Sequence, residues 1–234
     1  MSLLKTPAII LKSRKWGEAD RIVTFYTIRF GKIRGVARGV RKMKSRFGSA
    51  LEPFVHCDLN LFEKRNDPLY RVTQADIKET FAGLREDLML MSGAARLANL
   101  VAAVTAEGDP GPSVFETLLT GLRALQGGND PMLTTLIFQI RLLGQTGFRP
   151  QTHHCGACAE ALDRSDVERP TAFTPLCGGL VCDRCARRYA DRCLLLSPSS
   201  LSLLQHALQW TPSVLTRLKA TGQVRAELEA AIES

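Results

Sequence analysis

The stretch Gly31–Arg41, GKIRGVARGVR, alternates basic side chains with small or apolar ones. Successive side chains of a β-strand point to opposite faces, so this alternation predicts a strand with Lys32, Arg34 and Arg38 on one face. The opposite face would carry small and apolar residues, namely Ile33, Gly35, Ala37 and Gly39. Glycines inside a strand indicate a sharp bend, as at the corner of a small barrel.

The segments before and after this strand also have the sequence pattern of short β-strands. Apolar stretches at 8–11, 22–28, 54–62 and 69–73, together with 33–40, predict five short strands. Turn signals separate them at Trp16-Gly17, Phe30-Gly31, Gly48-Ser49 and Asn66-Asp67-Pro68. Five strands at this spacing are typical of a small β-barrel, which we expect over residues 1–78.

The barrel region also holds much of the positive charge. Thirteen of the 31 Lys and Arg residues, but only two of the 23 Asp and Glu residues, lie in the first fifty positions, a formal charge of +11. Surface charges act over only about 8 Å at physiological salt, so this cluster indicates a partner that docks directly on it. A polyanion fits, and nucleic acid is the commonest one.

The segment after Val40 extends the basic cluster. It contains no acidic residue, and we expect a loop that becomes ordered on a phosphate backbone. Small barrels bind single strands by adding aromatic faces to a basic groove. The available aromatic residues are mostly expected in the core, with Phe47 left open: Phe25, Tyr26, Phe30, Phe47 and Tyr70. A merely solvated basic face is the alternative interpretation.

Beyond residue 77 the apolar spacing becomes helical. Leu97, Leu100, Val101 and Val104 recur at intervals of three and four. Helix starts are predicted by a capping box at Ser113 and Glu116, by Asp130-Pro131, and near the C-terminus by Ser197-Pro198 and Thr211-Pro212. We expect an α+β protein in four segments: a barrel over 1–78, helices over 79–150, an irregular metal module over 151–193, and helices over 194–234.

Six of the seven cysteines lie between positions 155 and 193. Cys155 with Cys158, and Cys182 with Cys185, form two CxxC motifs with 23 residues between them. Four thiolates at this spacing predict one structural zinc ion per chain, in a closed sphere with no position for a reactive water. Substitute ligands remain open, as do free or disulfide-bonded cysteines: Cys177, Cys193, His153 and His154.

Motifs of catalysis are missing from the sequence. It contains neither a G-x-x-x-x-G-K-[ST] phosphate loop nor a G-x-G-x-x-G turn opening a helix. Its four histidines lie in no recognisable catalytic setting, and His56 suits a structural role in an apolar strand. Glu18 and Asp20 are expected to balance the basic hairpin around them. We therefore expect a protein that is not an enzyme.

Taken together, the motifs resemble the bacterial recombination mediator family RecO. The N-terminal part of the resemblance rests on Glu18-x-Asp20, Gly31–Arg41, Ser45-Arg46-Phe47 and Leu51-x-Pro53-Phe54. The later run Phe173-x-Pro175-x-x-Gly178-Gly179-Leu180-x-Cys182-x-x-Cys185 is similar to the zinc-binding members of that family. The resemblance extends over nearly the full chain, in domain order.

The resemblance implies an N-terminal OB-fold and a helical C-terminal domain interrupted by a zinc module. It implies a non-enzymatic role in recombinational repair: binding of single- and double-stranded DNA, strand annealing, and cooperation with RecR, RecA and, functionally, RecF in replacing single-stranded DNA-binding protein (SSB). The DNA contacts it implies are Lys32, Arg34, Arg38, Arg41, Lys42, Lys44 and Arg46.

Two expectations concern partners and location. The chain has no apolar run of about 18 residues and no secretory-type N-terminus, so we expect no membrane partner and a cytoplasmic, nucleoid-associated protein. An acidic SSB tail would require an apolar pocket rimmed by cations. The C-terminal segment supplies either that pocket or ordinary core: Leu203, Leu204, Leu208, Trp210, Leu215, Arg217 and Lys219.

Two other functions remain open at this point. A zinc-ribbon RNA-binding or transcription accessory factor would share the basic surface and the cysteine motifs. A metal-dependent nuclease is disfavoured, because four thiolates close the coordination sphere.

Overall fold

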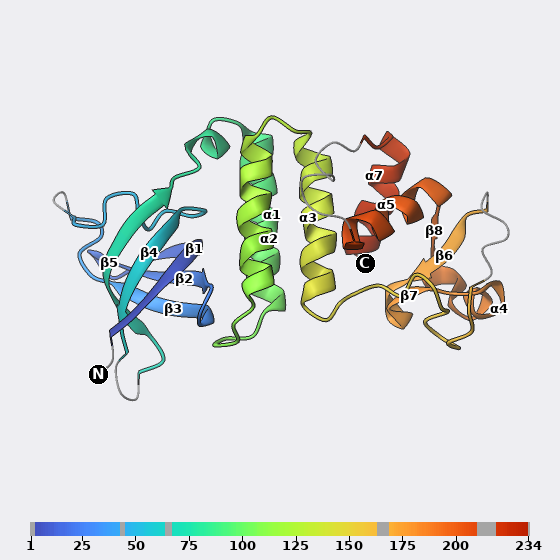
Figure 1. Cartoon of the computed structure of the whole chain (residues 1–234), viewed down its shortest axis with the longest axis horizontal. Coiled ribbons are helices and arrows are strands. Elements are labelled where there is room, and N and C mark those ends of the chain that lie inside the picture. Colours follow the sequence, from blue (N-terminus) through green and yellow to red (C-terminus); the bar gives the residue numbers. More distant parts are fainter. Residues whose placement is uncertain (1–2, 43–44, 64–66, 163–168, 210–218, 234) are drawn as a thin grey trace. The chain divides into compact units, whose positions relative to one another are not determined.

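The structure, a computed structural model, describes residues 3–42, 45–63, 67–162, 169–209 and 219–233 and confirms the α+β class (Figure 1). The chain forms two compact units, residues 1–128 and 129–234. The helices α1 (Leu88–Val104) and α2 (Pro112–Gln126) therefore belong to the same unit as the N-terminal strands. The division into four segments at 78, 150 and 193 stays a prediction.

Five strands of the first unit form a closed barrel in the order β1-β2-β3-β5-β4. All neighbours are antiparallel except β3 and β5, which pair in parallel at Gly35–Tyr70 and Val36–Arg71. A Cβ at Gly35 would lie 3.0 Å from the Tyr70 carbonyl oxygen, so glycine lets the two strands approach and the barrel close. The strands are β1 Leu3–Trp16, β2 Asp20–Thr27, β3 Gly31–Ala37, β4 His56–Phe62 and β5 Tyr70–Glu79.

The strand limits differ from those expected for identifiable reasons. β1 is much longer than 8–11, because it pairs with both β2 and β4 and continues through a register shift after Ile10. β3 ends at Ala37 rather than at residue 40, because Gly39 turns the chain with a φ of +71°. β4 begins two residues late because Phe54, at φ +72°, cannot continue a strand.

Alternation within β3 is confirmed. Ile33, Gly35 and Ala37 are buried, whereas Arg34 is exposed and Lys32 and Val36 are partly exposed. Inside the barrel, Ile33 packs with Phe25, Leu59 and other apolar side chains. Phe47 also belongs to this core, with only 3% of its surface exposed. The sequence alone had left open whether Phe47 is buried. Its burial removes Phe47 as a free stacking surface.

Two helices pack beside the barrel in the first unit, α1 Leu88–Val104 and α2 Pro112–Gln126, after a short 3-10 helix, η1 Ala82–Arg85. Asp87 caps α1 through its carboxylate, which accepts from Met89 N and Leu90 N. The expected capping box at Ser113 is wrong: α2 begins at Pro112 without a side-chain cap. Proline at the first position has the helical φ already set and has no N–H of its own that would need an acceptor.

His56 has the structural role expected of it. It is buried, its Nδ1 lies 3.2 Å from Glu79 Oε1, and its ring meets that of Phe115 edge-on. Glu79 also accepts from Arg123 of α2. This set of contacts fixes α2 against β4 and β5.

Among its described residues, the second unit has three helices of twelve residues or more, α3 Pro131–Gln145, α5 Pro198–Gln209 and α7 Gly222–Glu233. Asp130 caps α3 as expected, and Ser197 precedes α5 as expected. Thr211-Pro212 lies outside the described residues. The segment expected to be irregular, 151–193, contributes two strands, β6 Thr171–Thr174 and β7 Gly179–Leu180, to a small antiparallel sheet in the order β7-β6-β8, whose third strand is β8 Leu194–Leu196. Its side chains share a core with the helices, which includes Phe173, Leu180 and Leu196.

The loop before α2 presses on the start of β3, and this contact yields a stability test. A Cβ at Gly31, at φ +61°, would lie 1.9 Å from the carbonyl oxygen of Asp109, whereas one at Gly17, at φ +60°, would meet nothing within 4 Å. Gly17→Ala should cost roughly 1–2 kcal/mol of backbone strain. Gly31→Ala should cost roughly 1–3 kcal/mol more through overpacking. Equal losses in urea unfolding would show that the loop does not lie against β3.

Candidate metal centre and nucleic-acid interface

The first cysteine pair lies on a tight loop beside the small sheet. Cys155 N donates to Glu160 O and Ala159 N donates to Cys155 O, both at 2.8 Å. Gly156 N donates to Leu180 O of β7. A Cβ on Gly156 would lie 2.2 Å from the Cys177 carbonyl oxygen, so only glycine allows the loop to approach the sheet this closely.

The second cysteine pair begins a short helix, α4 Asp183–Ala186. Cys182 occupies its N-cap position and Cys185 lies one turn further on. Two glycines before it turn the chain: Gly178 has a φ of +67°, and a Cβ on Gly179 would lie 2.3 Å from Gln151 O. The chain thereby brings the second pair back to the first.

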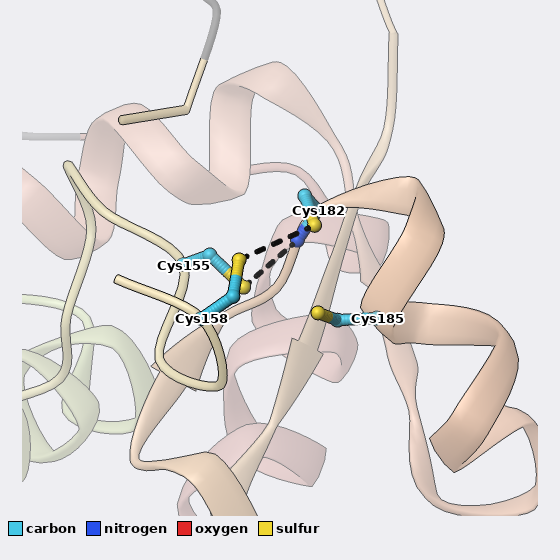
Figure 2. Close-up of side chains that lie close together, drawn as sticks. All are labelled: Cys155, Cys158, Cys182 and Cys185. Atoms are coloured by element: carbon cyan, nitrogen blue, oxygen red, sulfur yellow. Dashed lines mark hydrogen bonds between the residues drawn. The ribbon is translucent and has the colours of Figure 1, made fainter. Parts of the chain in front are cut away.

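Figure 2 shows the four cysteine side chains from the two motifs turned toward a common centre. Their sulfur atoms all lie within 4.8 Å of one another, and Cys158 Sγ lies 3.9 Å from Cys182 Sγ. A tetrahedral ion with Zn–S bonds of about 2.3 Å separates its sulfurs by about 3.8 Å. The cluster thus has dimensions that suit a metal ion.

The protonation of these thiols also suits a cation. Burial raises the pKa of Cys155, but N–H groups of Cys182, Cys158 and Ala157 outweigh it and lower that pKa to about 6. The pKa of Cys185 is raised to about 12, first by its hydrogen bond with Cys182 and then by burial. One thiolate forms readily and opposes ionisation of its neighbours, so a bound cation is what would allow all four to ionise.

Among the described residues, these four cysteines are the single cluster of His, Cys, Asp or Glu whose ligand atoms approach so closely. Cys177 and Cys193 pack partly buried at the edge of the cluster. His153 and His154 are exposed. The geometry therefore favours the four residues of the two CxxC motifs over the substitutes.

Two of the basic residues on β3 are engaged within the first unit. Lys32 Nζ donates to Ala102 O at 2.6 Å and to Thr105 O at 2.5 Å, at the C-terminal end of α1. Such a cation satisfies the last helical carbonyls and complements the helix dipole. Arg34 forms an exposed ion pair with Glu107, 2.9 Å from Nε to Oε1. Both side chains help hold α1 and its following loop beside β3.

The basic residues after β3 are differently placed. Arg38, Arg41, Lys42 and Arg46 are all exposed, and within the described part of the chain no carboxylate forms a salt bridge with them. Arg41 Nη1 donates to the backbone oxygen of Glu18, and its own N–H donates to Ala19 O. These bonds position Arg41 without neutralising it. Arg46 lies over the ring of Phe47, 4.9 Å from its centroid, and Lys44 lies outside the described residues.

A groove at one end of the barrel was missed by the sequence analysis. Its cavity volume is about 550 Å³, and Arg38 and Val36 lie along it with residues from the four other strands of the barrel. From the sequence, Trp16 was assigned only to a turn and Phe62 only to the end of an apolar strand. Their exposure, 56% and 37%, depends on the barrel register and could not be read from local pattern.

The C-terminal leucines considered as a partner pocket belong largely to the core. Leu203 and Leu204 are buried, Leu208 packs partly buried against them, and residues 210–218 lie outside the described part of the chain. A different apolar cavity of about 310 Å³ exists in the second unit, lined in part by Ile140, Leu143, Phe148, Arg149 and Phe173. Within the described residues, no helix is both long and apolar enough to span a membrane.

Comparison with known proteins agrees with this architecture. Residues 1–81 match the family model described as Recombination protein O N terminal, and residues 85–234 match Recombination protein O C terminal. The chain is 36% identical over 233 residues to DNA repair protein RecO of Heliobacterium modesticaldum, covering 100% of this chain and 84% of that protein.

A second relative gives the same result. DNA repair protein RecO of Bacillus subtilis is 31% identical over 231 residues, covering 99% of this chain and 87% of that protein. The two family models together span nearly the whole sequence, and the matches to these relatives cover 99–100% of the chain. The chain therefore belongs to the RecO family of DNA repair and recombination proteins.

Proposed function

We propose that this chain is a non-enzymatic recombination mediator that binds single- and double-stranded DNA and anneals complementary strands. In this role it would help load a RecA-type recombinase onto DNA covered by SSB. The single observation that carries the proposal is the group of exposed basic residues beyond β3, namely Arg38, Arg41, Lys42 and Arg46. Cationic side chains that bind phosphates without a base-reading element give affinity without sequence preference.

The barrel supports this assignment. A five-stranded closed barrel that precedes helices agrees with an OB-fold, in which the binding surface lies on the strands and loops of one face. We propose residues 1–78 as this DNA-binding domain. Lys32 and Arg34 contribute to its positive potential, whereas the exposed residues after β3, with Lys44, make the direct phosphate contacts.

Annealing follows from charge neutralisation. Two single strands repel each other through their phosphates, and a protein that neutralises both backbones lowers this barrier. Because the contacts fall on phosphates, the base edges stay available for pairing. The stability of the product duplex drives the reaction, and no nucleotide hydrolysis is needed.

We propose a structural zinc ion on the four clustered thiolates, one per chain. Closed thiolate coordination supplies folding energy rather than a reactive water, which is consistent with a protein that is not an enzyme. The ion would hold the segment 151–193, whose two strands, β6 and β7, have only four and two residues. Arg184 and Glu160, paired at 2.8 Å beside Cys158, would orient the ligands from outside.

The partner proteins of the proposal are SSB, RecR and, functionally, RecF and RecA. For the acidic tail of SSB, the apolar cavity beside Phe148 and Arg149 offers the required combination of a hydrophobic lining and a cation at its edge. Of the C-terminal leucines considered from the sequence, Leu204 lines this cavity, whereas Leu203 is buried outside it.

Replacement of Arg38, Arg41 and Lys42 by alanine should weaken DNA binding at low salt. Each phosphate contact contributes about 0.7 to the slope of log affinity against log salt for single strands, so the slope should fall in magnitude by about 2. Fluorescence anisotropy of a labelled oligonucleotide over a salt series measures both quantities.

The matched control removes three exposed arginines from the second unit, Arg187, Arg188 and Arg192, and so changes net charge equally. It should leave the slope near that of the unaltered protein. If both variants flatten the slope alike, binding reflects net charge alone and the proposed surface is wrong.

Purified protein should contain about one zinc per chain, measured by elemental analysis. Cys182→Ser should release the metal and lower the free energy of unfolding by several kcal/mol, since the energy of metal binding is largely folding energy. Cys193→Ser, which alters a cysteine at the edge of the cluster, should keep both metal and stability. A fully folded, metal-free protein would overturn the zinc site, and a neutral Cys182→Ser would point to Cys177 as the ligand.

A further inference from the structure

The groove at the end of the barrel gathers residues that the basic surface does not use. It lies between the tip of the β1–β2 hairpin, the end of β3, and the facing ends of β4 and β5. Its volume of about 550 Å³ is within the range of small-molecule sites. The described residues that line it include Trp16, Arg38, Phe62, Tyr70 and Arg71.

Three aromatic side chains meet at this groove from three different strands. Trp16 ends β1 with 56% of its surface exposed, Phe62 ends β4 with 37% exposed, and Tyr70 begins β5 partly buried. The core of the barrel is complete without Trp16 and Phe62, so burial within the fold does not explain them. Exposed aromatic side chains gathered in one hollow are typical of a recognition site.

The charged residues in the groove favour binding of a nucleobase over binding of a phosphate. Carboxylates of Asp20, Glu63 and Asp67 line it along with the two arginines. A phosphate would be repelled by three carboxylates, whereas a nucleobase presents amino and imino donors that carboxylates accept. Asp20 and Asp67 also accept from the backbone N–H groups of Gly39 and Leu69, which fixes them in the wall of the groove.

The groove is continuous with the proposed phosphate-binding surface. Arg38 lines it, and Arg41 is tied by two hydrogen bonds to Glu18 and Ala19, in the turn that follows Trp16. A strand whose phosphates lie on these arginines would pass the mouth of the groove with its bases available to enter.

We propose that this groove binds an unpaired base of single-stranded DNA by stacking on Trp16, with Phe62 and Tyr70 completing the apolar walls. The inference rests on the proposed DNA-binding function and adds a preference to it. Bases in a duplex are already stacked and paired, so the groove can engage single strands only. It would therefore hold each strand before annealing and release it once the duplex forms.

Tryptophan emission tests the contact directly. The sequence has two tryptophans, so Trp210→Phe leaves Trp16 as the single reporter. Titration with oligo(dT) should quench its emission, while a blunt duplex bound to the same extent should not. Anisotropy of labelled DNA, recorded in parallel, reports binding itself.

The two readouts separate the two proposals. Single-strand binding by anisotropy with unchanged Trp16 emission overturns the groove and leaves the DNA-binding function standing. Equal quenching by single strand and duplex overturns the single-strand preference. No binding of either DNA overturns the proposed function and this inference with it.

A second variant makes the test independent of Trp210. Trp16→Ala should lower affinity for single strands about tenfold, as expected for the loss of one stacked base, and leave duplex affinity unchanged. Trp16→Phe should retain most of the affinity, because it keeps an aromatic face. Ile77→Ala removes another exposed apolar side chain, from β5 and outside the groove, and should change neither affinity. Unchanged single-strand affinity in Trp16→Ala would overturn the proposal.

Discussion

The barrel and its binding surface depend on the position of β3, which must pair with β2 on one side and with β5 on the other. Gly35 allows the parallel contact with β5, and Gly31 allows the loop before α2 to lie against the strand. Lys32 then satisfies the final carbonyls of α1. One strand thus closes the barrel, anchors a helix, and leads directly into the exposed basic segment.

The basic residues therefore form two groups, those within β3 and those that follow it in the sequence. Those within β3 face the helices of the same unit and form intramolecular contacts, whereas those after Ala37 leave the sheet and remain exposed. Backbone hydrogen bonds to the β1–β2 turn hold Arg41 in place without cancelling its charge. In the second unit, the four clustered cysteines bring the loop at Cys155 and Cys158 together with the start of α4.

Local pattern was sufficient to predict the five strands of the barrel, the cysteine cluster and the alternation of β3, but not the small sheet of the second unit. Strand limits failed where a single backbone conformation decided them, as at Phe54 and Gly39, since such a φ angle has no signature in hydrophobic spacing. The internal engagement of Lys32 and Arg34 could not be foreseen, because their partners lie about 70 residues further along the chain. The groove around Trp16 was missed for the same reason: it is formed by the closure of the barrel.

The central claim is that exposed cations at one end of a barrel neutralise two DNA strands at once, and that this neutralisation accelerates pairing. The most direct measurement is the annealing rate of complementary oligonucleotides across a salt series, with the unaltered protein and with the variant lacking Arg38, Arg41 and Lys42. The unaltered protein should accelerate annealing strongly at low salt and progressively less as the salt concentration rises. The variant should accelerate annealing only weakly at every salt concentration. Equal acceleration by both proteins, or acceleration that does not depend on salt, would contradict the central claim.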